Sequence, residues 1–426
     1  MATNLLNSRS TPASQLISPS SLSPPVCPRL HQRRADPRSC AERPLVSRVQ
    51  ASSATADPPQ NSPGALDTLQ DDGKQGSPVA LERWLQRTRP APILEAEDVF
   101  NSLLGRLHPN ASRYRAFYNS EIGGIVTHPG MMLIHMDDHM VHRGHSVFDT
   151  AELTSGHLYC LDAHFARFIS SAAKAGILLP HTQAQMYRII LETAAASRLM
   201  FGSVRYWLSV GRGGFGLSPS ECITPTFYVM VTSPLEADPL IHTKGLRVCT
   251  SSVPAKDSFS ATVKSTNYLL NALNLFDAEQ SGYDQGIFVD EEENVLEGPN
   301  INLGIITKDH EMIVPPFERT LEGITLTRLL SLVPEYITSG TVPITSIQQR
   351  PINKYEAMEA LEVFVCGSSM KVRGVTSWDD AVIAEGRVGE ITMQLHGILT
   401  ADMEKGTSVL TAVPYGYLTA SGDWVE

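Results

Sequence analysis

A lysine among small polar residues and a carboxylate further along the chain have the clearest chemical potential. Lys264 lies within the run 262–268, and Glu297 follows within the run 296–302. A lysine amine can form a Schiff base with the aldehyde of pyridoxal phosphate and then move protons, which requires a desolvated site that lowers its pKa. A carboxylate such as Glu297 can keep the pyridine nitrogen protonated, and that charge makes the ring an electron sink. Such a pair occurs in many chains, so it needs support from other residues.

Three further segments carry residues suited to a phosphate group. His164 and Arg167 are three residues apart at the start of an expected helix, so both face one side of it. The planar guanidinium of Arg167 can bind two phosphate oxygens, although a surface arginine is equally compatible with the sequence. The runs 323–325 and 367–369 each place a small hydroxyl residue after a glycine, where backbone amides can cradle a phosphate. A lysine at one end and phosphate ligands at the other are the two anchors that pyridoxal phosphate needs.

The glycine-rich run 211–216 satisfies the GxGxxG pattern of dinucleotide-binding proteins. In those proteins a helix N-terminus follows the glycines and points at a pyrophosphate, but here Leu217-Ser218-Pro219 follows. We therefore interpret the glycines as permitting a tight turn or a close approach of the backbone to a ligand.

The segment 135–145 contains four histidines and two aspartates, which are residue types that bind zinc or iron. It passes from an apolar run into the turn signal Arg143-Gly144, so the histidines would point in different directions. We therefore expect no metal centre, and interpret the segment as a polar loop that lines a pocket, with one histidine near substrate.

Charge and composition argue against several classes of protein. The chain has 426 residues and a net charge of −11, and its first 51 residues hold seven Arg and two acids, which leaves the remainder near −16. Such an acidic body has no basic stripe for a nucleic acid. No run of eighteen apolar residues occurs, so the sequence predicts no membrane span. The six cysteines show no CxxC spacing and predict thiols rather than disulfides or a zinc site.

The first fifty residues have the composition of an organelle transit peptide. They are rich in Arg and Ser, contain no Lys, and lack the continuous apolar core of a secretory signal. Because Val49-Gln50-Ala51 resembles a plastid processing site, we expect a chloroplast location in the plastid stroma, with the mitochondrion as the alternative.

The rest of the chain alternates strands and helices, which predicts an α/β (α+β) fold of two domains. The candidate lysine falls in the second domain, and a site between domains is a common place for a cofactor. The expected parts are a transit peptide, a disordered linker, a leading helix, a small α/β domain, an interdomain linker and a large cofactor-binding domain: 1–51, 52–83, 84–111, 112–236, 237–242 and 243–426.

Local patterns predict the elements that would position these residues. Strands are expected at 116–126 and 131–136, joined by a His-Pro-Gly turn. The segment 158–177 should run from a strand into a helix, with Asp162 as its N-cap and Gly176 near its C-terminal end. A leading helix, a second helix and three strands are expected at 94–106, 185–199, 203–211, 226–233 and 246–252.

Six motifs in order resemble the fold type IV family of pyridoxal phosphate enzymes, the class IV aminotransferases. The likeness covers about 112–400 and is nearest to the plant plastid D-amino-acid transaminases that also act as aminodeoxychorismate lyases. It implies pyridoxal 5'-phosphate as cofactor and a homodimer with its site between the domains. The motifs are HRGHSVFDTAELTSGHLYCLDAHFARF, VRYWLSVGRGGFGLSP, TVKSTNYLLNAL, DQGIFVDEEENVLEGPNIN, LEGITLTRLL and ALEVFVCGSS.

The resemblance also implies a role for each matching position. Lys264 would form the Schiff base and carry the proton, and Glu297 would partner the pyridine nitrogen. Amides, a guanidinium and hydroxyls would hold the phosphate, from the residues Arg167, Ile324, Thr325 and Ser368.

Three positions would face the substrate. Ser369 would lie near the substrate carboxylate, and Arg212 matches the position at which bacterial D-amino-acid aminotransferases carry a carboxylate-binding arginine. His145 falls where those enzymes carry a tyrosine near the cofactor.

These roles predict transamination, which moves an amino group between a (D-)amino acid and a 2-oxo acid. A 4-amino-4-deoxychorismate lyase, giving 4-aminobenzoate and pyruvate, would share the first steps and is the first alternative. A branched-chain L-amino-acid aminotransferase is the second alternative. A catalytically dead binding protein is the non-enzyme alternative, although it would have no physical need for Lys264.

Overall fold

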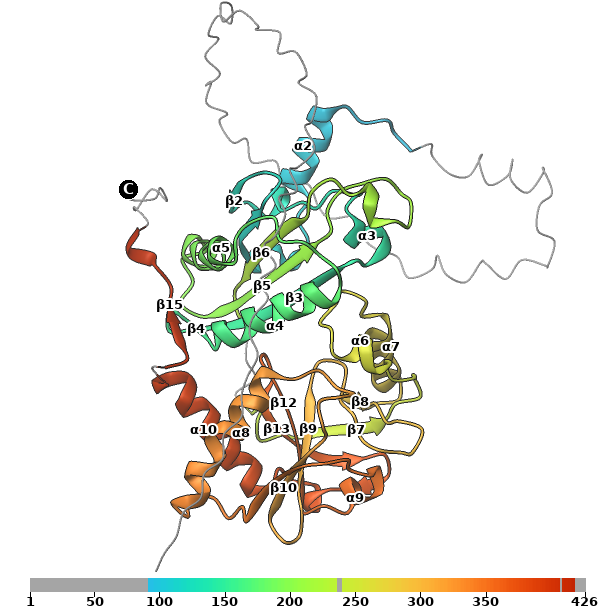
Figure 1. Cartoon of the computed structure of the whole chain (residues 1–426), viewed down its shortest axis with the longest axis vertical. Helices are drawn as coiled ribbons and strands as arrows, with labels where there is room; N and C mark the ends of the chain where they lie inside the picture. Colours follow the sequence, from blue (N-terminus) through green and yellow to red (C-terminus); the bar gives the residue numbers. More distant parts are fainter. Residues whose placement is uncertain (1–90, 236–239, 407, 418–426) are drawn as a thin grey trace, which may run out of the picture. The chain divides into compact units, whose positions relative to one another are not determined.

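The computed structural model describes residues 91–235, 240–406 and 408–417. The predicted transit peptide at 1–51 and linker at 52–83 lie outside these ranges. Within them the chain forms two β-sheets with helices packed against them (Figure 1). The α/β class predicted from the sequence is therefore confirmed.

The first sheet, within the described residues, has seven antiparallel strands in the order β15-β4-β3-β5-β6-β1-β2. Along β5, Val204, Tyr206 and Leu208 alternate and are fully buried, so one face of the strand packs against the helices, as where Phe168 meets Tyr206. The strands are β1 (Tyr114–Asn119), β2 (Gly124–Val126), β3 (Ser146–Thr154), β4 (His157–Tyr159), β5 (Gly202–Ser209), β6 (Thr226–Thr232) and β15 (Leu410–Ala412).

Helices α4 (Leu161–Lys174) and α5 (Gln183–Ala196) lie against this sheet (Figure 1). Asp162, predicted as the N-cap of α4, is instead its second residue, because the helix begins directly after β4 and Cys160 takes the capping position. The Asp162 carboxylate accepts a hydrogen bond from the Tyr187 hydroxyl at 2.6 Å. Gly176, with φ +68°, follows the C-terminal end of the helix as predicted.

The two strands predicted near the start of the fold are partly wrong. The first, 116–126, is a hairpin of β1 and β2, because Gly123 adopts φ +71° and reverses the chain. The second, 131–136, is not a strand, because β2 already occupies the edge of the sheet and the segment has no pairing partner. Its apolar residues Leu133 and Met136 are exposed.

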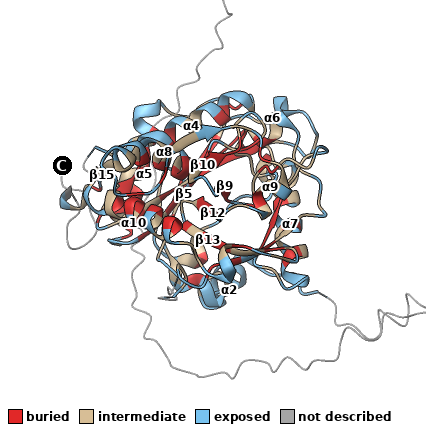
Figure 2. Cartoon of the chain, turned by 90° about the horizontal axis from the view of Figure 1, so that it is seen from below, coloured by how far each residue is buried: buried red, intermediate tan, exposed pale blue. Residues whose placement is uncertain are grey.

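The second sheet, in the part of the chain described, has eight strands with parallel and antiparallel pairs. Its central strands β9 and β12 are mostly apolar and almost wholly buried, as Figure 2 shows. The strands are β7 (Leu246–Thr250), β8 (Gln285–Ile287), β9 (Asn302–Ile306), β10 (Glu311–Val314), β11 (Ser346–Gln349), β12 (Glu362–Gly367), β13 (Lys371–Trp378) and β14 (Ala381–Val382).

Other helices complete the described structure, and α8 and α10 pack against one face of the second sheet. Among the described residues no helix is both long and apolar enough to cross a membrane. The remaining helices and these two are α2 (Ala96–Gly105), α3 (His139–Arg143), α6 (Ser258–Ala261), α7 (Leu269–Gln280), α8 (Ile324–Thr338), α9 (Lys354–Met358) and α10 (Glu390–Lys405).

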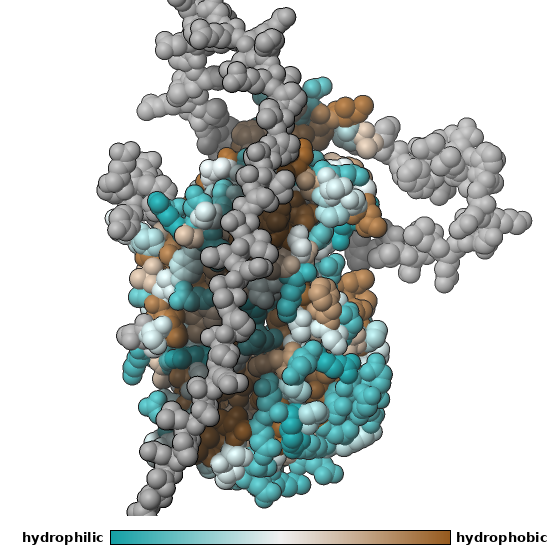
Figure 3. Space-filling model, in the orientation of Figure 1, coloured by the Kyte–Doolittle hydropathy of each residue, from teal (hydrophilic) through white to brown (hydrophobic). Residues whose placement is uncertain are grey.

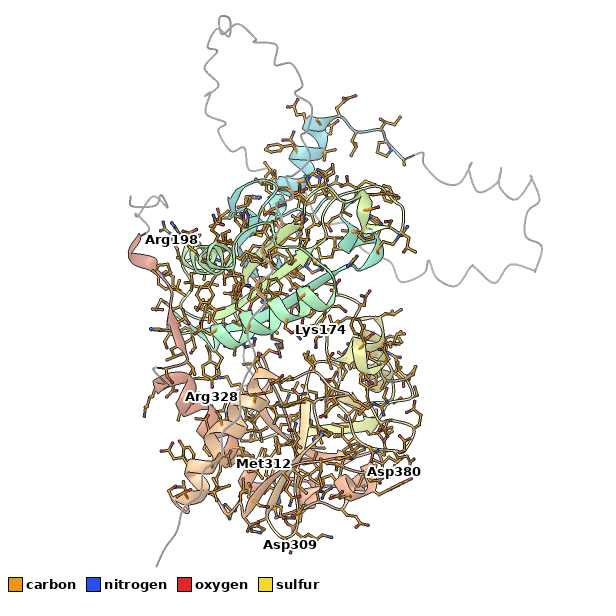
Figure 4. The ribbon with its side chains drawn as sticks, in the orientation of Figure 1. Lys174, Arg198, Asp309, Met312, Arg328 and Asp380 are labelled. Atoms are coloured by element: carbon orange, nitrogen blue, oxygen red, sulfur yellow. The ribbon has the colours of Figure 1, made fainter. Side chains whose placement is uncertain are left out.

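Two basic residues labelled in Figure 4 join separate elements of the fold. Lys174, at the end of α4, donates to the carbonyl and hydroxyl oxygens of Thr262 at 3.4 and 3.2 Å. Arg328 on α8 forms two hydrogen bonds, of 2.8 and 2.6 Å, with the Asp402 carboxylate on α10. These contacts tie α4 to the lysine segment and α8 to α10.

Candidate active site

Strand β3 and helix α4 hold the backbone around Lys264. The Phe148 amide donates to the Lys264 carbonyl at 2.9 Å, and the Thr266 amide donates to the Ser146 carbonyl at 3.0 Å. The Lys264 amide in turn donates to the Ser171 hydroxyl at 3.2 Å. The backbone of Lys264 is therefore held on both sides of its Cα by β3 and α4.

The Lys264 amine lies in an aromatic and partly desolvated environment. Its Nζ donates to the Tyr268 hydroxyl at 3.2 Å and lies 4.7 Å from the centroid of the Phe148 ring. Burial, followed by the charge of Arg167, lowers the pKa of Lys264 to about 8. A substantial fraction of the amine is thus neutral near pH 8, and the neutral amine is the nucleophile and the base.

Glu297 supplies a second group that titrates near neutrality. The Leu321 amide donates to its Oε2 at 3.0 Å, and the Phe288 amide donates to its main-chain carbonyl at 2.9 Å. Burial raises the pKa of Glu297 to about 7, although the hydrogen bond from Leu321 opposes the shift. Because burial increases its affinity for a proton, this carboxylate can accept a strong hydrogen bond from a neighbouring N–H group.

The N-terminus of α8 could hold an anion. The helix has fifteen residues and begins at Ile324 after Gly323, and no side chain caps it. A side chain at Gly323 would collide with the Asn302 side chain, so only glycine allows this close approach. Arg167 from α4 donates to the neighbouring Glu322 carbonyl at 2.8 Å, which brings a guanidinium to the same place.

All six predicted cofactor ligands line one open cavity, which also contacts Lys256, Tyr268 and Asn300. A guanidinium and helix amides lie among its walls with a reactive amine and a carboxylate, which is the donor set that pyridoxal phosphate requires. The residues present therefore fit this cofactor. The six are Arg167, Lys264, Glu297, Ile324, Thr325 and Ser368.

The three predicted substrate residues do not line this cavity. Arg212 is drawn away because its loop pairs with the neighbouring loop, where Asp137 binds its guanidinium through two hydrogen bonds of 2.8 and 2.9 Å. The His145 Nε2 donates to the Ala175 carbonyl at 2.9 Å. Ser369 is exposed in the turn after Ser368.

Arg205 and Tyr268 are near the Lys264 amine but were not predicted as site residues from the sequence. The Arg205 guanidinium lies 5.2 Å from the centroid of the Phe148 ring, the ring that the Lys264 amine also contacts. Its Nε donates to the Thr150 hydroxyl at 2.9 Å. The signals for these residues were an arginine within an apolar strand and a tyrosine four residues after the lysine.

In the described part of the chain, no group of three or more His, Cys, Asp or Glu side chains is arranged to hold a metal ion. In the histidine-rich segment, His139 and His142 pack edge to face with ring centroids 5.1 Å apart. The described cysteines are free thiols: Cys160, Cys222, Cys249 and Cys366.

The lowered pKa of Lys264 predicts how stability without cofactor depends on pH. Below pH 8 the folded and unfolded chains both carry the proton, and the folded state bears the cost of burying the charge. Between about pH 8 and the ordinary pKa of 10.5, only the unfolded chain keeps the proton on Lys264, so the stability of the wild type rises with pH. We expect Lys264→Met to raise the Tm at pH 7 and to lose this advantage by pH 10. Scanning calorimetry would contradict this if the Tm difference did not change with pH.

Known proteins of one family are similar to this chain, and a model of the class IV amino-transferase family matches residues 146–378. The chloroplastic D-amino-acid transaminase of Arabidopsis thaliana is 38% identical over 326 residues, or 76% of this chain and 86% of that protein. A putative branched-chain-amino-acid aminotransferase of Methanocaldococcus jannaschii is 29% identical, over 61% of this chain and 87% of that protein. The branched-chain amino acid aminotransferase of Thermobaculum terrenum, solved in its PLP form, superposes with a TM-score of 0.61 at 19% identity, over 70% of this chain and 98% of that one. This last likeness establishes a shared fold.

Proposed function

This chain belongs to the class IV aminotransferase family, and we propose that it transfers the amino group of a D-amino acid to a 2-oxo acid with pyridoxal phosphate as cofactor. The observation that supports this most directly is the lysine amine, with a pKa of about 8, in one cavity with the half-buried carboxylate of Glu297 and an uncapped helix N-terminus. Such a set is costly to bury without a ligand that uses it.

Each group of the cavity has a defined task in this proposal. Arg167, the first amides of α8 and the Ser368 hydroxyl bind the phosphate, and Glu297 holds the proton of the pyridine nitrogen. When bound, the cofactor supplies the electron sink that stabilises the charge left when a Cα–H bond breaks. Lys264 takes the Cα proton at Nζ and returns it on the cofactor side. Tyr268, which accepts from Nζ, holds the amine in position between these events.

The preference for a D-amino acid rests on the relatives. The identity of 38% to a D-amino-acid transaminase exceeds the 29% to a branched-chain enzyme, so branched-chain L-amino acids rank second. Cleavage of 4-amino-4-deoxychorismate would use the same lysine and carboxylate, and it ranks third.

The test uses purified protein that begins at Ser52, loaded with pyridoxal phosphate. We expect D-alanine, added without any oxo acid, to shift the visible absorbance of the cofactor to that of pyridoxamine phosphate. L-leucine should leave the spectrum unchanged, and 4-amino-4-deoxychorismate should yield little 4-aminobenzoate. A shift with L-leucine alone would favour the branched-chain activity, and rapid 4-aminobenzoate release would favour the lyase.

We propose Arg205 as the partner of the substrate carboxylate, in place of Arg212. Its Nε donates to the Thr150 hydroxyl, and its guanidinium lies near the Phe148 ring, which the Lys264 amine also contacts. A charge-assisted hydrogen bond contributes about 1.5–3 kcal/mol, so Arg205→Gln should lower kcat/KM for D-alanine by about 10- to 100-fold. Arg212→Gln is the matched control, because its guanidinium is already paired with Asp137. Equal losses in the two variants would contradict the assignment.

We also propose that the protein is a homodimer. Large apolar side chains are exposed on two loops that pair through Asp138 and Arg212, and Figure 3 shows apolar surface around α2 at the top of the view. Association would remove these side chains from water. Light scattering of the purified protein tests the proposal, and a monomer at micromolar concentration would exclude it. The exposed loop residues are Leu133, Ile134, Met136, Phe215, Leu217 and Ile223.

The composition of the first fifty residues and the chloroplastic relative together support a plastid location. The full chain should enter isolated chloroplasts and be shortened there, and a chain that begins at Ser52 should stay outside. Uptake by mitochondria alone would favour the alternative location.

A further inference from the structure

A fully buried carboxylate lies behind the arginine at the phosphate end of the cavity. Asp149 lies on β3 and is 0% exposed. It accepts two parallel hydrogen bonds from Arg167, Nε to Oδ2 and Nη2 to Oδ1, each of 2.8 Å. His164, one turn earlier on α4, lies with Nδ1 2.8 Å from Oδ1. Because an ionised carboxylate only accepts, Nδ1 carries the proton of this bond.

Resting on the proposed function, we propose that Asp149 is a positioning residue that aims the Arg167 guanidinium at the phosphate of the cofactor. A guanidinium has five N–H groups, of which two bind Asp149 and a third binds the Glu322 carbonyl at 2.8 Å. Two N–H groups, one on each terminal nitrogen, then remain for a ligand in the cavity that Arg167 lines.

Fixing the guanidinium in advance has a physical benefit. A free arginine loses several rotamers when it binds a phosphate, whereas a fork already held by a carboxylate loses few. Burial opposes the charge on both partners, but their attraction outweighs it: the pKa of Asp149 is far below its ordinary value and that of Arg167 is above it. The pair is therefore ionised before any cofactor arrives.

A positioning role and a purely electrostatic role predict opposite results for Asp149→Asn. Loss of the negative charge alone would leave Arg167 uncompensated and increase its attraction for a phosphate dianion. Loss of the geometry would weaken binding, because the new amide nitrogen faces a guanidinium N–H, donor against donor. Only one of the two parallel bonds then persists, and the guanidinium is free to turn.

The chain contains a matched control for this variant. Arg328 also forms two hydrogen bonds with a carboxylate, that of Asp402, which accepts a third from the Tyr159 hydroxyl at 2.6 Å. Neither partner lines the cavity, and Figure 4 labels Arg328 on α8. Asp402→Asn therefore removes the same kind of pair and should lower stability without reaching the cofactor.

The experiment titrates the cofactor-free full chain with pyridoxal phosphate and, separately, with pyridoxal, which lacks the phosphate, and follows visible absorbance. Asp149→Asn should weaken pyridoxal phosphate binding about 10- to 100-fold and leave pyridoxal binding unchanged. Inorganic phosphate should compete with pyridoxal phosphate less well in this variant than in the wild type. Asp402→Asn should lower the Tm and change neither affinity.

Unchanged or tighter binding of pyridoxal phosphate by Asp149→Asn would overturn the inference, as would an equal loss for pyridoxal. If the wild type bound neither compound, the proposed function would fail with it. If Asp149→Asn does not fold, His164→Gln serves instead, because it removes only the hydrogen bond between the imidazole and Asp149. This variant should weaken the binding of pyridoxal phosphate about fivefold and leave the binding of pyridoxal unchanged. No change in that variant would count against the inference.

Discussion

Loss of turnover by about 10⁴-fold or more is the result we expect for Lys264→Ala. The amine is both the group that bonds to the cofactor and the base that moves the Cα proton, and alanine can do neither. In the structure, β3, Ser171 and Tyr268 fix the backbone and the amine of Lys264, so the wild type holds this base in one place. Single-turnover absorbance with D-alanine measures the proton-transfer step separately from product release.

The matched control for this prediction is Lys256→Ala. Lys256 lines the same cavity, and its amine lies 4.5 Å from the centroid of the Tyr268 ring. This variant should keep the visible absorbance of a cofactor bonded to the protein, which Lys264→Ala should lose. If Lys264→Ala turned over normally and Lys256→Ala were inactive, the catalytic lysine would be Lys256 and not Lys264.

Glu297→Gln should lower the rate of the half-reaction by about 10²- to 10³-fold. Glutamine fills the same space but cannot hold a protonated pyridine nitrogen, so the electron sink is lost while the phosphate end is untouched. Binding of the cofactor should fall much less than the rate. Glu293→Gln is the control, because Glu293 pairs with Lys354 outside the cavity.

The same variant should become more stable without cofactor. The pKa of Glu297 is about 7 in the folded protein against an ordinary 4.5, so the folded state binds more protons across that range and wild-type stability falls as the pH rises. Above pH 7 the full cost of the buried charge is present, and glutamine removes it. A higher Tm at pH 8 with a lower rate would separate loss of chemistry from loss of folding. A lower Tm at pH 8 would contradict the cause given for the raised pKa.

The sequence predicted residues that the structure brings into one cavity, because their signals are local. A glycine before a helix start marks Ile324 and Thr325, and the lysine run marks Lys264, whatever the rest of the fold does. The class of the fold followed from the alternation of strands and helices. These features depend on a few neighbouring residues, so spacing and order predict them.

The substrate residues were harder because their directions depend on distant partners. Arg212 looks available in the sequence, but its guanidinium is held by Asp137, 75 residues away. His145 is likewise turned toward the Ala175 carbonyl. The sequence did not predict a role for Asp149. Its signal was a carboxylate in a buried strand, followed by His164 and Arg167 on one helix face.

Strand β15 ties the end of the chain to a sheet that is otherwise complete before residue 233. Leu410 pairs with Tyr159, a partner about 250 residues earlier. A ribosome delivers the N-terminal part first, so β4 remains an open edge until residues 410–412 have been made. An open edge is a template for pairing with other chains, and contacts this distant form slowly. Newly made protein should therefore depend on chaperones until β15 emerges, and a version that stops before Leu410 should aggregate even though its cavity residues are all present.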